Sequence, residues 1–276
     1  MMSDNAPPMP GHSSPLVDFA IAGAQKCGTT AIKAMLGKHR SVYMLPKVKH
    51  DYFIYSPLAF SPLARWGYER RFHPAAHHTC IGESSSSYLF YPHALVRLRR
   101  YNPALKLIIT LRNPAARAFS HWNMNVTKGR ETRSFSEAIA GELRSRLIFR
   151  QRHHFAYLQR GLYGRQIERL LELFEREQVL LLRSEATLAE PPRTWASLMD
   201  FLKLPDRTMP QRHVWNSRPY ASSLGHDEEA RLMDFFAPDI ELLSRLTGID
   251  FSAWLKLPEP TSQAGEETRK AEALGV

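Results

Sequence analysis

The sequence predicts an α/β fold of three layers, in which helices cover both faces of a central, mostly parallel sheet. The apolar run at 17–22 indicates a strand, and the glycine-bounded turn after it indicates a loop. Apolar residues then recur at helical spacing up to Leu36, which indicates a helix. A second apolar run, at 107–111, is continuous, as is typical of a strand that helices cover on both faces. Both features favour a sheet enclosed by helices.

The middle of the 276-residue chain contains no linker rich in Gly, Ser or Pro, so a single domain is predicted for residues 16–258. Residues 1–15 and 259–276 are polar and poor in apolar side chains, which predicts a flexible tail at each end. Within the domain, further strands are predicted at 41–45 and 179–182, and the stretch 80–89 is predicted to be a strand that ends in a polar turn. An irregular region with short helix turns is predicted at 57–80, and helices at 115–122, 135–140, 161–174, 191–202 and 232–246.

The stretch Gly-Ala-Gln-Lys-Cys-Gly-Thr-Thr, residues 23–30, predicts an anion site. In a strand–loop–helix unit, backbone N–H groups and the positive end of the helix dipole converge on one point. Gly23 and Gly28 have the spacing of the phosphate loop G-x-x-x-x-G-K-[ST], but Thr29 stands where that motif has lysine, and the lysine comes earlier, at Lys26. An ordinary tight turn is the alternative interpretation of the glycines alone.

A second pattern suited to phosphate follows the predicted strand at 107–111. Arg112 comes directly after this strand, Pro114 marks the turn, and Ser120 lies on the helix that follows. A forked guanidinium matches a phosphate group bidentately, and a serine adds a neutral donor. Although an arginine at a strand end is common, its occurrence with Pro114, Arg117 and Ser120 is not.

Composition limits the class of partner. The chain has 37 basic and 27 acidic residues, a net charge of +10 and a pI of about 9.7, which favours anionic partners. It has no zinc-finger spacing, RNP signature or basic heptads, so nucleic acid is not predicted. The two cysteines have no metal-ligand spacing, so no metal site is predicted. No apolar stretch is long enough for a membrane span, and no signal-peptide pattern is present. The sequence therefore predicts a reduced, cytoplasmic enzyme.

Taken in order, these motifs resemble the sulfotransferases that use 3′-phosphoadenosine 5′-phosphosulfate (PAPS), and in particular the heparan-sulfate-type and bacterial members. The loop G-x-x-K-x-G-T-T is similar to their 5′-phosphosulfate loop, and the Arg-Asn-Pro and Arg-Ala-x-Ser sequence at 112–120 to their 3′-phosphate motif. The pattern GLYxxQIxxLxxxF at 161–174 resembles their C-terminal half. The resemblance covers roughly residues 16–255 and implies PAPS as donor and 3′,5′-adenosine bisphosphate (PAP) as product.

The resemblance also implies which residues contact the donor. These enzymes close a basic loop over the 3′-phosphate, often with Lys-Gly-Arg; that tripeptide is absent here, and Arg218 or Arg212 takes its place in the prediction. The predicted donor-binding residues are Gly23, Lys26, Cys27, Gly28, Thr29, Thr30, Arg112, Ser120 and Arg218. For Cys27 the backbone N–H is expected to matter more than the thiol.

A basic and aromatic stretch at 47–53 resembles the segment that provides the catalytic base. Relatives have a glutamate after the lysine, and this chain has His50 after Lys49. A histidine with an ordinary pKa of about 6.5 can accept a proton near neutral pH, so His50 is the predicted base, with Asp51 and Glu83 as alternatives. Glu83 is also expected to hold loop lysines or His50 in place. Lys26 is predicted to stabilise charge on the transferred group.

The predicted reaction is transfer of a sulfuryl group from PAPS to a hydroxyl of a small-molecule, lipid or carbohydrate acceptor, by in-line displacement without metal. The excess of basic residues is also compatible with an anionic acceptor. A P-loop nucleotide kinase is one alternative, but it requires a lysine after Gly28 and a second-strand aspartate for magnesium. A non-catalytic nucleotide-binding module is another, because the usual glutamate and the Lys-Gly-Arg are replaced.

Overall fold

The computed structural model describes residues 16–46, 51–56, 61–144, 149–205, 207–209 and 224–256. The predicted tails at 1–15 and 259–276 lie outside these residues. The sheet has five strands in the order β2-β3-β1-β4-β5, and each neighbouring pair is parallel. The strands are β1 Phe19–Gly23, β2 Val42–Met44, β3 Cys80–Ser84, β4 Lys106–Leu111 and β5 Val179–Arg183.

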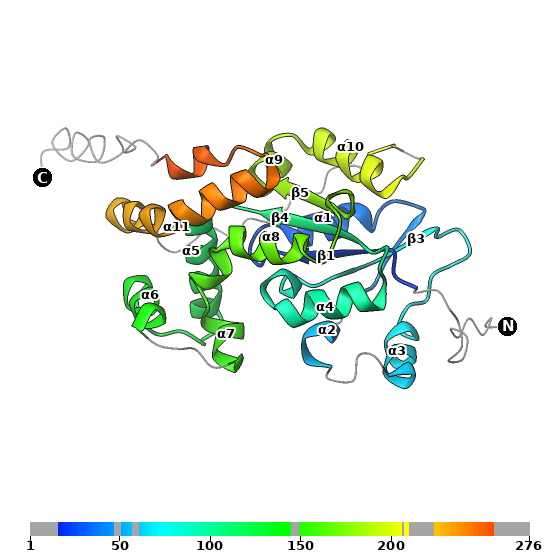
Figure 1. Cartoon of the computed structure of the whole chain (residues 1–276), viewed down its shortest axis with the longest axis horizontal. Helices are drawn as coiled ribbons and strands as arrows, with labels where there is room; N and C mark the ends of the chain where they lie inside the picture. The colour runs from blue at the N-terminus through cyan, green and yellow to red at the C-terminus, as the bar shows by residue number, and fades with distance from the viewer. Residues whose placement is uncertain are drawn as a thin grey trace, which may run out of the picture.

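Helices lie on both sides of this sheet (Figure 1). The α-helices are α1 Thr29–Leu36, α2 Tyr52–Tyr55, α3 Pro62–Glu69, α4 Pro92–Tyr101, α5 Pro114–Thr127, α6 Phe135–Arg144, α7 Phe149–Phe155, α8 Tyr163–Leu171, α9 Ser184–Ala189, α10 Pro191–Leu202 and α11 His226–Thr247. Short 3₁₀ turns are η1 Tyr88–Phe90, η2 Gln159–Gly161, η3 Arg176–Gln178 and η4 Ser252–Leu255. The predicted α/β/α architecture is therefore confirmed.

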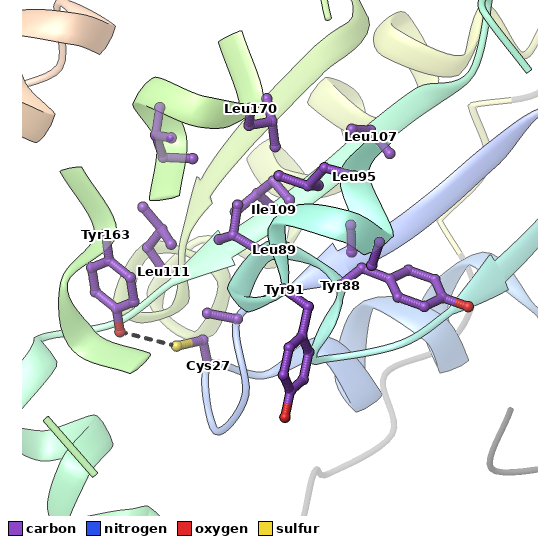
Figure 2. Packing of buried hydrophobic residues seen from close by; sticks show 14 of the residues in the cluster. Cys27, Tyr88, Leu89, Tyr91, Leu95, Leu107, Ile109, Leu111, Tyr163 and Leu170 are labelled. Carbon is purple, nitrogen blue, oxygen red and sulfur yellow. Dashed lines mark hydrogen bonds between the residues drawn. The ribbon is translucent and has the colours of Figure 1, made fainter. Parts of the chain in front are cut away.

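Successive residues of the central strand β1 face opposite layers. Phe19 and Ile21 pack in a core shared with α1 and α10, whereas Ala20 and Ala22 pack in a core shared with α4, α8 and α11. Figure 2 shows part of the latter core, where leucines of α4 and α8 lie over Leu107 and Ile109 of β4. Because both faces are covered, β1 is apolar throughout, and β4 is apolar over Leu107–Ile109.

The strand that begins at Cys80 ends in a polar turn as predicted, since β3 ends at Ser84 and η1 follows. Two boundaries differ from the prediction. The region 57–80, expected to hold only short helix turns, contains the eight-residue helix α3, whose first turn is capped by the Ser61 hydroxyl accepting from the Ala64 N–H at 3.1 Å. The helix expected at 115–122 runs to Thr127, and the Asn113 side chain caps its first N–H groups.

The loops that follow the strands meet at one edge of the sheet. The chain leaves β1 toward β2 and β3 on one side, and continues from β4 to β5 on the other. In parallel sheets a ligand crevice forms at the carboxyl ends where such connections diverge. The anion loop after β1, the segment after β3 and Arg112 after β4 all lie at this edge.

Two kinds of feature are missing from the described part of the chain. It contains no group of three or more His, Cys, Asp or Glu side chains placed to bind a metal ion. None of its helices has both the length and the apolar character that a membrane crossing requires. Cys27 and Cys80 are both buried free thiols.

Candidate active site

The anion loop, residues 24–28, connects the end of β1 to the N-terminus of α1. Its backbone takes two left-handed turns, with φ of 70° at Lys26 and 88° at Gly28, and the second is a conformation that glycine adopts most readily. The first N–H groups of a helix have no partner within it, so those of Thr29 and Thr30 point out of the N-terminus of α1. Together with the helix dipole they form a site for an anion.

Contacts to neighbouring elements hold this loop. The Ala24 N–H donates to the Thr110 carbonyl of β4 at 2.8 Å, and the Cys27 N–H closes a turn onto the Ala24 carbonyl at 3.2 Å. The Cys27 Sγ lies 3.4 Å from the Tyr163 hydroxyl of α8 (Figure 2). Burial raises the pKa of the Cys27 thiol to about 11, so the thiol is protonated at neutral pH and serves packing. The predicted donor contact of its N–H remains a prediction.

Arg112 follows β4, the strand next to β1, so its side chain begins beside the anion loop. Its charge acts on the Cys27 thiol inside that loop. The next residue is fixed firmly, because the Asn113 N–H donates to Glu185 Oε1 at 2.9 Å. Ser120 lies two turns into α5 and is buried. The structure thus brings the loop and Arg112 to adjacent strand ends, and the phosphate contacts of Arg112 and Ser120 remain predictions.

Glu83, near the end of β3, is only 2% exposed. Burial raises the pKa of its carboxyl to about 7, although the hydroxyl groups of Tyr68 and Tyr88 act to lower it. Asp51 raises this pKa further, and the charge of Lys33 on α1 lowers it. Glu83 is therefore surrounded by two tyrosines and a helix lysine, and it carries a fractional charge at neutral pH.

Asp51, the residue after the predicted base, is anchored at the same edge of the sheet. The Ser85 hydroxyl donates to Asp51 Oδ1 at 2.5 Å and accepts from the Ser87 N–H at 3.2 Å. The segment after β3 thereby fixes the start of α2. His50 and Arg218 lie outside the described residues, so their roles remain predictions.

A family comparison matches this arrangement. The sulfotransferase domain family matches residues 16–218, a range that contains the anion loop, Glu83, Arg112 and Ser120. The chain belongs to the sulfotransferase family. Its five-stranded parallel sheet and enclosing helices also match the crystal structure of a sulfotransferase from Alicyclobacillus acidocaldarius, with a TM-score of 0.74 and 31% identity, covering 88% of this chain and all of that one.

Two relatives of this sulfotransferase are named for heparan sulfate. The bifunctional heparan sulfate N-deacetylase/N-sulfotransferase 1 of Caenorhabditis briggsae is 27% identical over 210 residues, which cover 72% of this chain and 24% of the relative. The human heparan sulfate glucosamine 3-O-sulfotransferase 3B1 is 22% identical over 284 residues, which cover 90% of this chain and 70% of the relative. The chain thus spans about a quarter of the length of the bifunctional relative.

Two arginines and a histidine are buried near the loop of this sulfotransferase, and none of them is among the predicted donor-binding or catalytic residues, although Arg117 belongs to the motif at 112–120. Arg117 and His121 lie on α5 with 0% exposure, and Arg160 lies in η2 with 2%. Burial lowers the pKa of each, and the charges of Arg117, Arg160 and Lys26 lower that of His121 further. Arg117 and His121 are four residues apart and so share one face of α5, but whether that face is buried depends on tertiary packing.

The buried arginine of α5 suits an anionic ligand at the neighbouring loop. Arg117 donates from Nη2 to the Tyr157 carbonyl, while its Nε and Nη1 have no hydrogen-bond partner. Both ring nitrogens of His121 also lack one. A buried charge without a counter-charge is unfavourable by several kcal/mol, roughly, unless something compensates it. An anionic ligand at the neighbouring loop would provide that compensation.

Glu83→Gln is expected to remove a pH dependence of folding stability. Because the folded-state pKa of about 7 lies above the ordinary value of 4.5, the stabilisation from the protonated carboxyl is fully present below that ordinary value and is lost as the pH rises through 7. Relative to the variant, the wild-type free energy of unfolding should fall by about 3 kcal/mol between about pH 4 and pH 8. Urea denaturation at a series of pH values measures this difference.

The matched control for this experiment is Glu168→Gln on α8, where the side chain is exposed. We expect its stability to follow the wild-type pH profile. Parallel profiles for the wild type and Glu83→Gln would contradict the raised pKa of Glu83.

Proposed function

We propose that this sulfotransferase transfers a sulfuryl group from PAPS to a hydroxyl group. The observation that carries the proposal is the anion loop at the end of β1 beside Arg112 at the end of the adjacent strand β4. The anion loop offers N–H groups and a helix dipole, and Arg112 offers a guanidinium. Two anion sites at adjacent strand ends suit a donor that carries phosphate at two positions. The family match supports sulfuryl transfer in general.

In the proposed reaction, the acceptor oxygen attacks sulfur in line with the departing oxygen of the 5′-phosphate. One S–O bond forms while the other breaks, PAP leaves with the bonding pair, and the base takes the acceptor proton. As in phosphoryl transfer, positioning and charge stabilisation dominate such a displacement. Lys26 and the N–H groups of Thr29 and Thr30 are the proposed partners of the charge that develops on the sulfuryl and phosphate oxygens.

We assign the proton transfer to residues 50–51. His50 is the first choice because its ordinary pKa suits neutral pH, and Asp51, held by Ser85, is the alternative. Glu83 is enclosed by Tyr68 and Tyr88, so its proposed role is to fix the segment after β3. Of this pair, the structure describes Asp51, which Ser85 holds next to the end of β3.

A carbohydrate is the first acceptor class to test, since the relatives named above act on heparan sulfate by their names. The net charge of +10 agrees with an anionic acceptor as well as an anionic donor. The names of the relatives include both N- and O-sulfation, and a hydroxyl acceptor is proposed because the 3-O-sulfotransferase matches over 90% of this chain.

The test supplies radiolabelled PAPS without added metal, together with heparosan, N-deacetylated heparosan, phenols and lipid-linked sugars as acceptors. We expect equal amounts of PAP and of an O-sulfated product, with no effect of a chelator. PAP binding without turnover of any acceptor favours the non-catalytic module, and tight binding of ATP with magnesium in place of PAP favours the kinase. Product formed only from the N-deacetylated polymer contradicts the hydroxyl acceptor.

A further inference from the structure

Tyr55 is a large aromatic side chain that is exposed on an otherwise well-packed helix. It ends the four-residue helix α2 and is 52% exposed, whereas Phe53 and Ile54 of the same helix are 1% and 4% exposed. Its hydroxyl group forms a hydrogen bond of 2.9 Å with Nδ1 of His153 on α7. A tyrosine has few rotamers to lose and offers a broad apolar face, so an exposed and anchored one is suited to contact a ligand.

Contacts at both ends fix the helix that carries Tyr55. At its start, Asp51 accepts the hydrogen bond of the Ser85 hydroxyl. At its end, Arg97 of α4 donates from Nη1 to the carbonyls of the two residues before Tyr55, at 2.8 and 3.0 Å. The Tyr55 N–H itself donates to the Asp51 carbonyl at 3.0 Å. The Tyr55 ring is therefore held one helical turn from Asp51, a candidate base.

Tyr55 belongs to an uncharged aromatic cluster with His153 and Tyr91. The imidazole of His153 packs on the Tyr55 ring with 5.7 Å between centroids, and it stacks on the Tyr91 ring at 6.3 Å and 14°. Burial and the charge of Arg160 lower the pKa of His153 to about 4, although Asp51 acts to raise it. The imidazole is therefore neutral at neutral pH. In a chain with a net charge of +10, these three rings offer an apolar surface.

The aromatic cluster lies close to both halves of the proposed active site. Burial and the charge of Asp51 raise the pKa of the Tyr55 hydroxyl to about 12, so it keeps its proton and does not serve as the base. Arg160, whose charge also acts on Tyr55, lines one small hollow together with Ala24 and Gln25 of the anion loop. An acceptor whose hydroxyl group reaches the base would thus have the rest of its structure beside Tyr55.

We propose that the ring of Tyr55 stacks on the ring that carries the sulfated hydroxyl of the acceptor. This inference rests on the proposed function and adds a residue that determines acceptor specificity. The Tyr55 hydroxyl is engaged by His153, so the contact offered to a ligand is the exposed ring, and His153 is a positioning residue. The C–H face of a sugar and the face of a phenol share the required chemistry, because each buries apolar area and leaves its hydroxyl at the edge of the ring.

The test is calorimetric binding of three probes to the full chain saturated with PAP: a heparosan hexasaccharide, uncharged chitohexaose and p-cresol. Tyr55→Leu, which removes the ring, should weaken a ring probe about tenfold, with the Kd of PAP within about twofold of wild type. Tyr55→Phe keeps the ring and loses only the contact to His153, so it should weaken the same probe by about threefold or less. Loss for the sugars assigns a sugar ring, and loss for p-cresol alone assigns a phenol.

The matched control is Phe235→Leu, because Phe235 is another exposed aromatic residue, on α11, with 37% exposure. This variant should bind PAP and the probes like the wild type. Wild-type probe affinity in Tyr55→Leu, even with lowered thermal stability, would limit Tyr55 to packing between α2 and α7 and overturn the inference.

Three further outcomes are decisive. An equal loss in Tyr55→Phe and Tyr55→Leu would assign the contact to the hydroxyl and not to the ring, which also overturns the inference. The same holds for an equal loss of PAP affinity in Tyr55→Leu, and for a wild type that binds PAP but none of the three probes. A wild type that does not bind PAP contradicts the proposed function instead.

Discussion

His50→Ala is expected to lower kcat by about a thousandfold while the Kd of PAP changes by less than about twofold. The reason is that a general base acts on the acceptor proton and not on the donor, which the anion loop and Arg112 are proposed to hold. Steady-state PAP formation and calorimetry measure the two quantities. Added imidazole should restore part of the activity, and His77→Ala, at an exposed histidine, should behave like the wild type.

The pH dependence of kcat distinguishes the three candidate bases. With His50 as base, kcat should fall as the pH drops below about 6.5, the ordinary pKa of a histidine. Glu83, with a pKa of about 7, can give a similar fall, so the profile is repeated in Glu83→Gln. An unchanged fall in that variant supports His50. Full turnover in His50→Ala together with none in Asp51→Asn transfers the role to Asp51.

Arg112→Ala is expected to weaken PAP binding about tenfold to a hundredfold, because it removes a charge-assisted contact to the 3′-phosphate. The loss should be specific to that phosphate. Adenosine 5′-phosphate, which lacks it, should bind the variant and the wild type with similar affinity. Calorimetry with both nucleotides gives the four dissociation constants.

The control for this prediction is Arg100→Ala, since Arg100 is exposed on α4. It removes one positive charge without touching the proposed site, and we expect wild-type affinity for PAP. If Arg112→Ala weakens both nucleotides equally, the guanidinium does not read the 3′-phosphate and its assignment fails.

The spacing of apolar residues in the sequence was enough to predict the strands and helices whose buried side chains recur at regular intervals. The continuous run at 107–111 corresponds to β4, and the helix predicted at 191–202 has the bounds of α10. Helix α4 is not predicted, although its buried residues Ala94, Leu95, Leu98 and Tyr101 have helical spacing. Its basic residues interrupt that pattern, and the helix packs on β4 and α8 through its buried face.

The site was predictable where a residue adjoins a strand end. Gly28 and Arg112 are placed by the strands before them, so their neighbourhood follows from the parallel order. Arg160 and His121 were not predictable, because nothing local distinguishes a buried cation from a solvated one. Their burial arises from η2 and α5 packing together, with Glu142 of α6 accepting the Leu158 and Gln159 N–H groups at 2.8 and 3.0 Å.

The strand order has a consequence for how this protein can diversify. The proposed donor residues follow β1 and β4, which each have neighbours on both sides, so substitutions there disturb the most enclosed part of the sheet. Of the candidate bases, His50 and Asp51 follow β2, a three-residue strand at the margin, and Glu83 lies in the neighbouring strand β3. Substitutions at the margin of the sheet can therefore change which acceptor is used, while the residues proposed to bind the donor, at its centre, stay the same.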